Sequence, residues 1–164
     1  MGLAASFEPH PDLAPLRFLL GTWRGEGAGG YPTIGSFRYG EEMIFEDVGE
    51  RYLLYRQSSW TLDEGAPVHF ERGFLRPGID PLIVELTLAH PLGLTEVGEG
   101  RVDGTSLHIA SDSVTRTTTG DAVTSLARRY RVQDDVLSYE IDMAMDETPM
   151  TRHLAAQLTK VPLR

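Results

Sequence analysis

The sequence predicts an all-β protein, built as an antiparallel up-and-down barrel of about ten strands with a short N-terminal helical turn. Two observations favour this fold class. Apolar residues alternate with polar ones at a period of two through most of the chain, which is typical of strands that bury one face. Short apolar segments also recur at spacings of about 10–12 residues, without a long amphipathic helix. A barrel is favoured over a sandwich because closure leaves no unpaired sheet edge.

The chain of 164 residues is long enough for one domain with a core, and too short for two comfortable ones. We assign residues 1–12 to an irregular arm, because this stretch contains Pro9 and Pro11 and shows little periodicity. Residues 13–164 form the expected barrel domain. It begins with a helical turn at residues 13–20, whose apolar side chains are expected to plug one end of the barrel: Leu16, Phe18 and Leu19.

Alternation at a period of two begins after Gly21, and it continues to the C-terminus. Asp103 and Gly104 supply a strong tight-turn signal between two of the segments. A barrel of this strand number is too wide to be filled by side chains alone, so we expect a ligand cavity. The expected strands cover residues 22–27, 39–45, 51–61, 68–75, 82–88, 95–102, 107–114, 123–132, 136–145 and 153–161.

The charge and composition exclude several classes of function. A net charge of −9 repels the phosphates of nucleic acids and anionic membrane surfaces, so neither is an expected partner. The absence of cysteine excludes disulfides and thiolate metal sites. The N-terminus lacks the pattern of a signal peptide, and no apolar run approaches the roughly 20 residues of a membrane span. We therefore expect a cytoplasmic protein, and no segment indicates an obligate protein partner.

The usual catalytic signatures are missing, which leaves the five histidines as the main candidates for chemistry. No two of them show the spacing of a recognisable zinc pair. His108 alternates with Leu107 and Ile109, which predicts an outward side chain. The alternation of apolar and polar residues does not show whether the side chain of His69 points inward or outward. Taken alone, each histidine is more often a surface residue than a ligand.

Several short motifs, in order along the chain, resemble the nitrobindins, a family of ferric haem β-barrels. Residues 21–27, GTWRGEG, match the GxWxGxG motif of that family. Residues 31–34 (YPTI), 67–73 (PVHFERG) and 93–97 (GLTEV) resemble the segments that follow it. Residues 149–154, PMTRHL, resemble the segment that carries the haem ligand. The similarity runs from about residue 13 to residue 161, nearly the whole chain.

The resemblance implies one haem b bound near an open end of the barrel, with His153 as the axial ligand of a ferric iron and as the catalytic residue. A single axial histidine leaves the sixth iron position free for a small molecule. Thr33 is expected to hydrogen-bond beside the haem. Arg128 is expected to offset a propionate charge, although Arg129 is the neighbour with which it is most easily confused. The other residues implied to line or approach the pocket are Met143, His69 and His90.

The resemblance further implies that the protein binds nitric oxide and isomerises peroxynitrite to nitrate. This rearrangement needs no external electrons, because the atoms of the substrate recombine. Two other functions are compatible with the same barrel. One is an iron-free carrier of an apolar small molecule, similar to the fatty-acid-binding proteins, which has no need of His153. The other is a nitric oxide sensor, which is less favoured because no output segment is present. Whether His69 or His90 faces the iron is left open.

Overall fold

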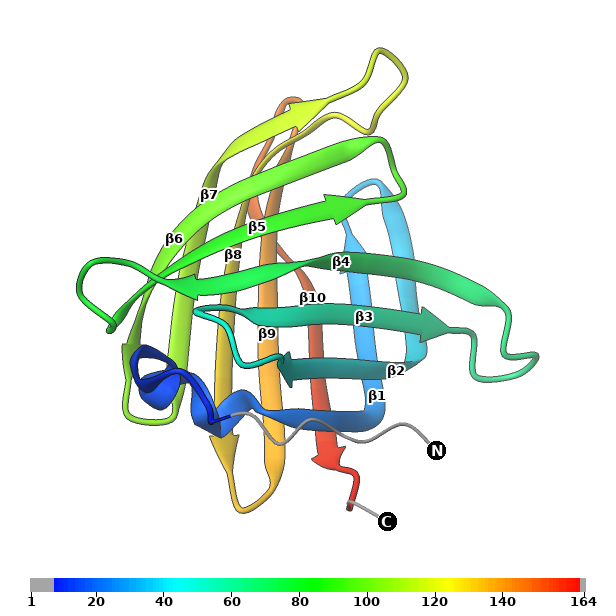
Figure 1. The fold of residues 1–164 in the computed structure, drawn as a ribbon. Coiled ribbons are helices and arrows are strands. Elements are labelled where there is room, and N and C mark those ends of the chain that lie inside the picture. Colours follow the sequence, from blue (N-terminus) through cyan, green and yellow to red (C-terminus); the bar gives the residue numbers. More distant parts are fainter. Residues whose placement is uncertain (1–7, 163–164) are drawn as a thin grey trace, which may run out of the picture.

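The computed structural model describes residues 8–162, and within this range the chain forms one closed antiparallel barrel of ten strands (Figure 1). The prediction of the fold class is confirmed. Residues 1–7 of the expected arm and residues 163–164 of the expected domain lie outside the described range. The elements in chain order are η1 (Pro11–Leu19), β1 (Gly21–Tyr31), β2 (Ile34–Asp47), β3 (Leu53–Trp60), β4 (Pro67–Pro77), β5 (Ile83–His90), β6 (Leu94–Asp103), β7 (Ser106–Arg116), β8 (Val123–Gln133), β9 (Val136–Met145) and β10 (Thr148–Lys160).

Each strand pairs with its neighbours in sequence, and β1 closes the barrel by pairing with β10 as well as with β2. Because the connections alternate between the two ends, the turns after β1, β3, β5, β7 and β9 share one end, which we call the open end (Figure 1). The strands β2 and β10 begin several residues earlier than expected. These early segments reach the open end, where several side chains are exposed, and they lack the apolar alternation that marks a strand.

The opposite end is closed by η1, which we call the plug. It is a 3-10 helix, and the three residues per turn of that helix bring Leu13, Leu16 and Leu19 onto one buried face. The expectation of an apolar plug is confirmed, although Phe18 is only partly buried and Leu13 takes the third position. Two polar contacts hold the plug in place. The indole Nε1 of Trp23 donates to the Leu19 carbonyl over 2.7 Å, and Arg51 pairs with Asp12 over 2.7 Å.

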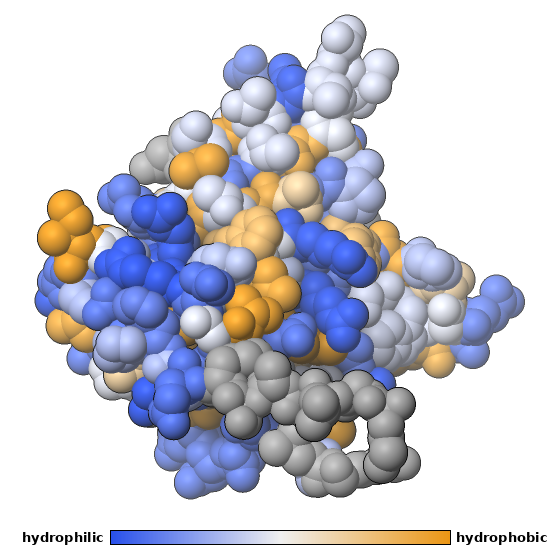
Figure 2. Space-filling model, viewed as in Figure 1, coloured by the Kyte–Doolittle hydropathy of each residue, from blue (hydrophilic) through white to orange (hydrophobic). Residues whose placement is uncertain are grey.

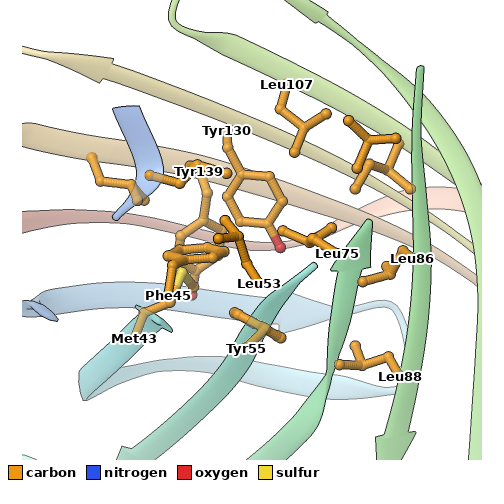
Figure 3. Close-up of a cluster of buried hydrophobic side chains, with 14 of the residues drawn as sticks. Met43, Phe45, Leu53, Tyr55, Leu75, Leu86, Leu88, Leu107, Tyr130 and Tyr139 are labelled. Atoms are coloured by element: carbon orange, nitrogen blue, oxygen red, sulfur yellow. The ribbon is translucent and has the colours of Figure 1, made fainter. Parts of the chain in front are cut away.

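Above the plug, the alternating inward residues of β2 to β9 fill the barrel with a tightly packed apolar core. Figure 3 shows this cluster, in which the rings of Phe45, Tyr130 and Tyr139 lie among leucines from neighbouring strands. The phenylalanine ring centroid is 6.2 Å from that of Tyr130, in an edge-to-face arrangement. Towards the open end, core residues such as Leu94, Leu126 and Ile141 also line a cavity.

The outer surface is a mosaic of hydrophilic side chains and small apolar patches (Figure 2). His108 lies on this outer face and is exposed, which confirms the prediction from its alternation with Leu107 and Ile109. No helix in the range 8–162 is long and apolar enough to cross a membrane.

Candidate functional site

A cavity of about 260 Å³ occupies the open end of the barrel. Its walls are mostly apolar, and they come from strands on every side of the barrel because alternate residues of each strand point inward. Polar side chains gather on one part of the wall and at its floor. The apolar wall consists of Ile34, Phe37, Val68, Leu92, Leu94, Val123, Leu126, Ile141, Met143 and Leu154.

His153 lies in the wall of this cavity because β10 contains a β-bulge at that residue. On β9 the partners of Arg152 and Leu154 are the adjacent residues Asp142 and Ile141, so His153 is an extra residue without a partner. A bulge changes the direction in which side chains point along a strand. Arg152 consequently turns outward and pairs with Asp142 on the surface, while His153 and Leu154 both line the cavity.

The imidazole of His153 is held by one hydrogen bond and two aromatic rings. Its Nδ1 lies 3.0 Å from the carbonyl oxygen of Gly30. A carbonyl can only accept, so Nδ1 carries the proton and Nε2 keeps its lone pair. The rings of Tyr31 and Phe37 meet the imidazole edge-on at centroid distances of 5.6 and 6.4 Å. This arrangement fixes one tautomer and one nitrogen for binding a metal.

Gly29 makes room for this packing. A Cβ at this position would overlap the Phe37 ring and would lie 2.8 Å from a methyl group of Leu154, too close for real atoms. The glycine is followed by a register shift between Gly29 and Tyr31. Gly29 therefore allows the close packing around the histidine on the adjacent strand.

A buried ionic cluster forms part of the cavity wall and floor. Arg128 is 1% exposed, and its guanidinium donates to both carboxylate oxygens of Glu71, at 2.9 and 3.1 Å, and also to Glu96. Burial by itself raises a carboxyl pKa, yet the Arg128 charge, with smaller contributions from His69 and His90, holds the pKa of Glu71 well below its usual range. The same guanidinium outweighs burial and lowers the pKa of Glu96.

The two arginines considered from the sequence lie on opposite faces of β8. Arg128 lines the cavity, whereas Arg129 points outward and pairs with Asp142 over 2.8 Å. However, two buried carboxylates already neutralise the Arg128 charge. The structure thus gives this arginine partners inside the barrel that differ from the haem propionate expected from the sequence.

The remaining expected residues differ in how closely they approach the cavity. Met143, His69 and His90 all line it. The carbonyl of Met143 accepts a hydrogen bond from the Tyr31 hydroxyl over 3.0 Å, which joins the β1–β2 hairpin to β9. Thr33 lies in the exposed turn between β1 and β2, at the rim of the open end.

A second buried polar group, which the sequence did not single out, lies beside the cavity. Glu41 accepts hydrogen bonds from Gln57 at 2.8 Å and from the Tyr139 hydroxyl at 2.7 Å. Tyr39 completes the group through a contact of 2.6 Å between its hydroxyl and that of Tyr139. Burial raises the pKa of Glu41 to about 7. The alternation in the sequence does indicate that Glu41 is buried, because it shares the inward face of β2 with Tyr39 and Met43.

The cavity residues fit a haem group. A haem needs apolar walls for its macrocycle, a histidine with a free nitrogen for its iron and access to solvent for its propionates. The cavity supplies the walls, and His153 supplies Nε2. Three wall residues at the rim are also exposed to solvent: Ile34 (52%), Val68 (47%) and Leu92 (44%). An apolar rim of this kind is what a partly inserted macrocycle would cover.

A family model described as the THAP4-like, heme-binding beta-barrel domain matches residues 12–160, most of the chain. The protein belongs to this family. Membership confirms the resemblance to the nitrobindins that the sequence motifs indicated. Because the family binds haem, the iron-free carrier is no longer favoured.

Known relatives resemble the chain over nearly its whole length. A peroxynitrite isomerase of Nocardia farcinica (strain IFM 10152) is 46% identical over 160 aligned residues, which cover 92% of each protein. Peroxynitrite isomerase 2 of Mycobacterium marinum (strain ATCC BAA-535 / M) is 43% identical and covers 92% of this chain and 96% of the relative. The crystal structure of Rv2717c from M. tuberculosis superposes with a TM-score of 0.88 at 40% identity, covering 94% of this chain and all of that one.

Proposed function

We propose that this THAP4-like barrel is a haem-dependent peroxynitrite isomerase that converts peroxynitrite to nitrate. The observation that carries the proposal is His153, whose Nδ1 is bound to the Gly30 carbonyl and whose Nε2 is free at the wall of an apolar cavity. The 43–46% identical relatives named peroxynitrite isomerases support the reaction. The ligands proposed for the site are peroxynitrite and nitric oxide, and the proposed compartment is the cytoplasm.

The proposed cofactor is one haem b with ferric iron. His153 would hold it through Nε2, the apolar wall would enclose its macrocycle, and Thr33 at the rim would hydrogen-bond beside it. When bound, this cofactor would supply a Lewis-acidic ferric iron, and the isomerisation of peroxynitrite to nitrate needs no gain or loss of electrons.

The residues around the cavity orient His153, exclude water and set the local charge. The Gly30 carbonyl and the rings of Tyr31 and Phe37 hold the imidazole in one orientation, in which Nε2 would be available to the iron. Apolar side chains such as Leu126 and Ile141 exclude water from the inner part of the cavity. The Arg128 charge, which would attract anions, is neutralised by Glu71 and Glu96.

Stopped-flow decay of peroxynitrite, with nitrate measured as product, tests this function. We expect haem-loaded wild type and His108→Ala to accelerate the decay equally, since His108 is exposed on the outer surface. We expect His153→Ala to lose most of the acceleration at the same protein concentration. Equal rates for wild type and His153→Ala, or decay to nitrite instead of nitrate, would exclude the proposed reaction at this site.

A further inference from the structure

Three side-chain atoms with the chemistry of metal ligands converge on one point of the cavity wall. The Nε2 atom of His69 is 3.3 Å from Nδ1 of His90. The Oε1 atom of Glu71 is 3.4 Å from the former and 3.5 Å from the latter. Strand pairing produces this meeting, since His69 and Glu71 occupy alternate positions of β4 while His90 ends the adjacent β5.

We propose that His69, Glu71 and His90 form a second metal site, separate from His153, that binds Zn²⁺. A tetrahedral zinc ion with ligands at about 2.0–2.1 Å places neighbouring ligands about 3.3–3.4 Å apart. Two of the observed separations, 3.3 and 3.4 Å, fall on these tetrahedron edges, and the third, 3.5 Å, is slightly longer. Two histidines and one glutamate are also a common set of protein ligands for a zinc ion that keeps a fourth position open. Here all three ligands line the cavity, so the fourth position faces it.

The surroundings of His90 orient its ring so that Nδ1 can act as a metal ligand. Its Nε2 lies 3.1 Å from a carboxylate oxygen of Glu96, and its side chain is 5% exposed. Because the carboxylate of Glu96 accepts, Nε2 is the donor, and Nδ1 presents its lone pair to the proposed ion. A carboxylate that orients a histidine in this way is the usual outer partner of a zinc ligand.

The local charge also suits one divalent cation. Glu71 and Glu96 carry two negative charges, and Arg128 carries one positive charge, which leaves one negative charge in a buried region. Two imidazole ligands favour zinc and similar transition metals over magnesium and calcium, which prefer oxygen ligands. Glu71 Oε1 also accepts from the Arg128 guanidinium over 2.9 Å, and His69 Nε2 is the atom that lies within reach of both this oxygen and Nδ1 of His90.

Calorimetric titration with ZnCl2 after chelator treatment tests this site, with the haem-loaded protein and the haem-free protein measured side by side. We expect wild type to bind one zinc ion per chain. We expect His69→Ala and His90→Ala each to weaken binding by about 100-fold or more, since each removes a ligand. His108→Ala serves as the matched control, and we expect it to bind zinc as wild type does.

Two further variants keep the result unambiguous. His69→Gln preserves the size and polarity of a partly exposed side chain but replaces the imidazole, so we expect a folded protein with weakened zinc binding. His153→Ala separates the proposed site from the haem ligand, and we expect it to retain zinc binding in the haem-free protein. Thermal unfolding of each variant verifies that it is folded.

Zinc binding that depends on His69 and His90 in either form of the protein supports the site. Zinc binding in the haem-free form alone would also support the site, and it would mean that zinc and haem compete for the cavity. Three results would overturn the proposal: no stoichiometric binding in either form, equal affinity in all variants, or loss of binding only in His153→Ala. None of these outcomes depends on peroxynitrite chemistry, so the second metal site and the proposed isomerase fail or succeed separately.

Discussion

The Nδ1 atom of His153 and the carbonyl oxygen of Gly30 lie 3.0 Å apart, which joins two strands through the side chain that faces the cavity. The two residues are neighbours because β10 pairs with β1 across the closure of the barrel. Gly30 on the first strand and the histidine on the last strand are therefore parts of one site. Closure of the barrel creates the site, and the hydrogen bond selects the nitrogen that it offers.

The rings around His153 give a first prediction. Tyr31→Ala removes the ring that packs against the imidazole edge, and we expect it to weaken haem binding by roughly 10-fold because the ligand loses its fixed orientation. Tyr31→Phe keeps the ring and loses only the hydroxyl that donates to Met143, so its haem affinity should stay close to that of wild type. Titration with hemin, followed by absorbance, compares the variants. Equal affinities for Tyr31→Ala and wild type would contradict the role of the ring.

The buried arginine gives a second prediction. Arg128→Ala leaves Glu71 and Glu96 buried without their guanidinium partner, and we expect a loss of about 3–5 kcal/mol in the free energy of unfolding. Arg129→Ala removes only an exposed pair with Asp142 and should cost about 0–1 kcal/mol. Urea unfolding at neutral pH measures both. Similar losses for the two neighbours would show that the buried cluster is not a major part of the fold.

The pKa of Glu41 gives a third prediction, for the pH dependence of stability. Its pKa of about 7 in the folded protein lies above the usual value of 4.5, so the folded state binds more protons than the unfolded state between these values. The contribution is complete below about pH 4.5 and is lost as the pH rises towards 7, by on the order of 3 kcal/mol. Glu41→Gln should remove this part of the pH dependence.

Urea unfolding of wild type and Glu41→Gln at several pH values from 4.5 to 8 shows whether the free energy of unfolding falls as the pH rises. Glu71 and Glu96 do not interfere, because their lowered pKa values place the corresponding loss of stability on the acidic side, below the range measured. Glu42→Gln is the control on the outer face of the same strand, where the carboxylate pairs with Arg24. The raised pKa of Glu41 would be contradicted if the stability of wild type rose between pH 5 and 7 and that of Glu41→Gln rose equally.

The plug gives a fourth prediction. Leu16→Ala opens a hole in a fully buried contact, and we expect it to lower the free energy of unfolding by about 2–5 kcal/mol. Haem affinity should change little, because the plug and the cavity occupy opposite ends of the barrel. Chemical unfolding of Leu16→Ala gives its free energy of unfolding, and hemin titration gives its haem affinity. A large loss of haem affinity in a folded Leu16→Ala protein would mean that the two ends are coupled.

The barrel could be predicted from the sequence because alternation is a local property. Val84, Leu86 and Leu88 recur at every second position and are all buried, as expected for one face of a strand. The same rule placed His108 outside. The ends of β2 and β10 were less predictable, because near the open rim several side chains on both faces meet solvent and the pattern disappears.

The site was harder to predict because it depends on pairings between distant strands. Counting back at a period of two from Leu158, Ala156 and Leu154 puts His153 on the outer face, and only the bulge at that residue brings it to the cavity. Alternation alone does not reveal such a bulge. The family resemblance identified the histidine for a different reason, through the motif around it.

The ionic cluster shows what alternation reveals and what it does not. Glu71 and Glu96 lie at inward positions of their strands, so a careful count predicts two buried carboxylates. Their partner on β8 becomes evident only when the barrel is closed, since 57 residues separate Arg128 from Glu71. The family resemblance implied a propionate as the partner of Arg128, and the sequence pattern alone does not reveal which inward carboxylates face this arginine.

The most direct test of the central claim is the visible absorption spectrum of the protein after addition of hemin, for wild type beside His153→Ala and His108→Ala. We predict a Soret band from one ferric haem per chain in wild type and His108→Ala, and its loss or shift in His153→Ala. A spectrum unchanged by His153→Ala would show that another residue ligates the iron. Failure of wild type to bind hemin stoichiometrically would contradict the haem site itself.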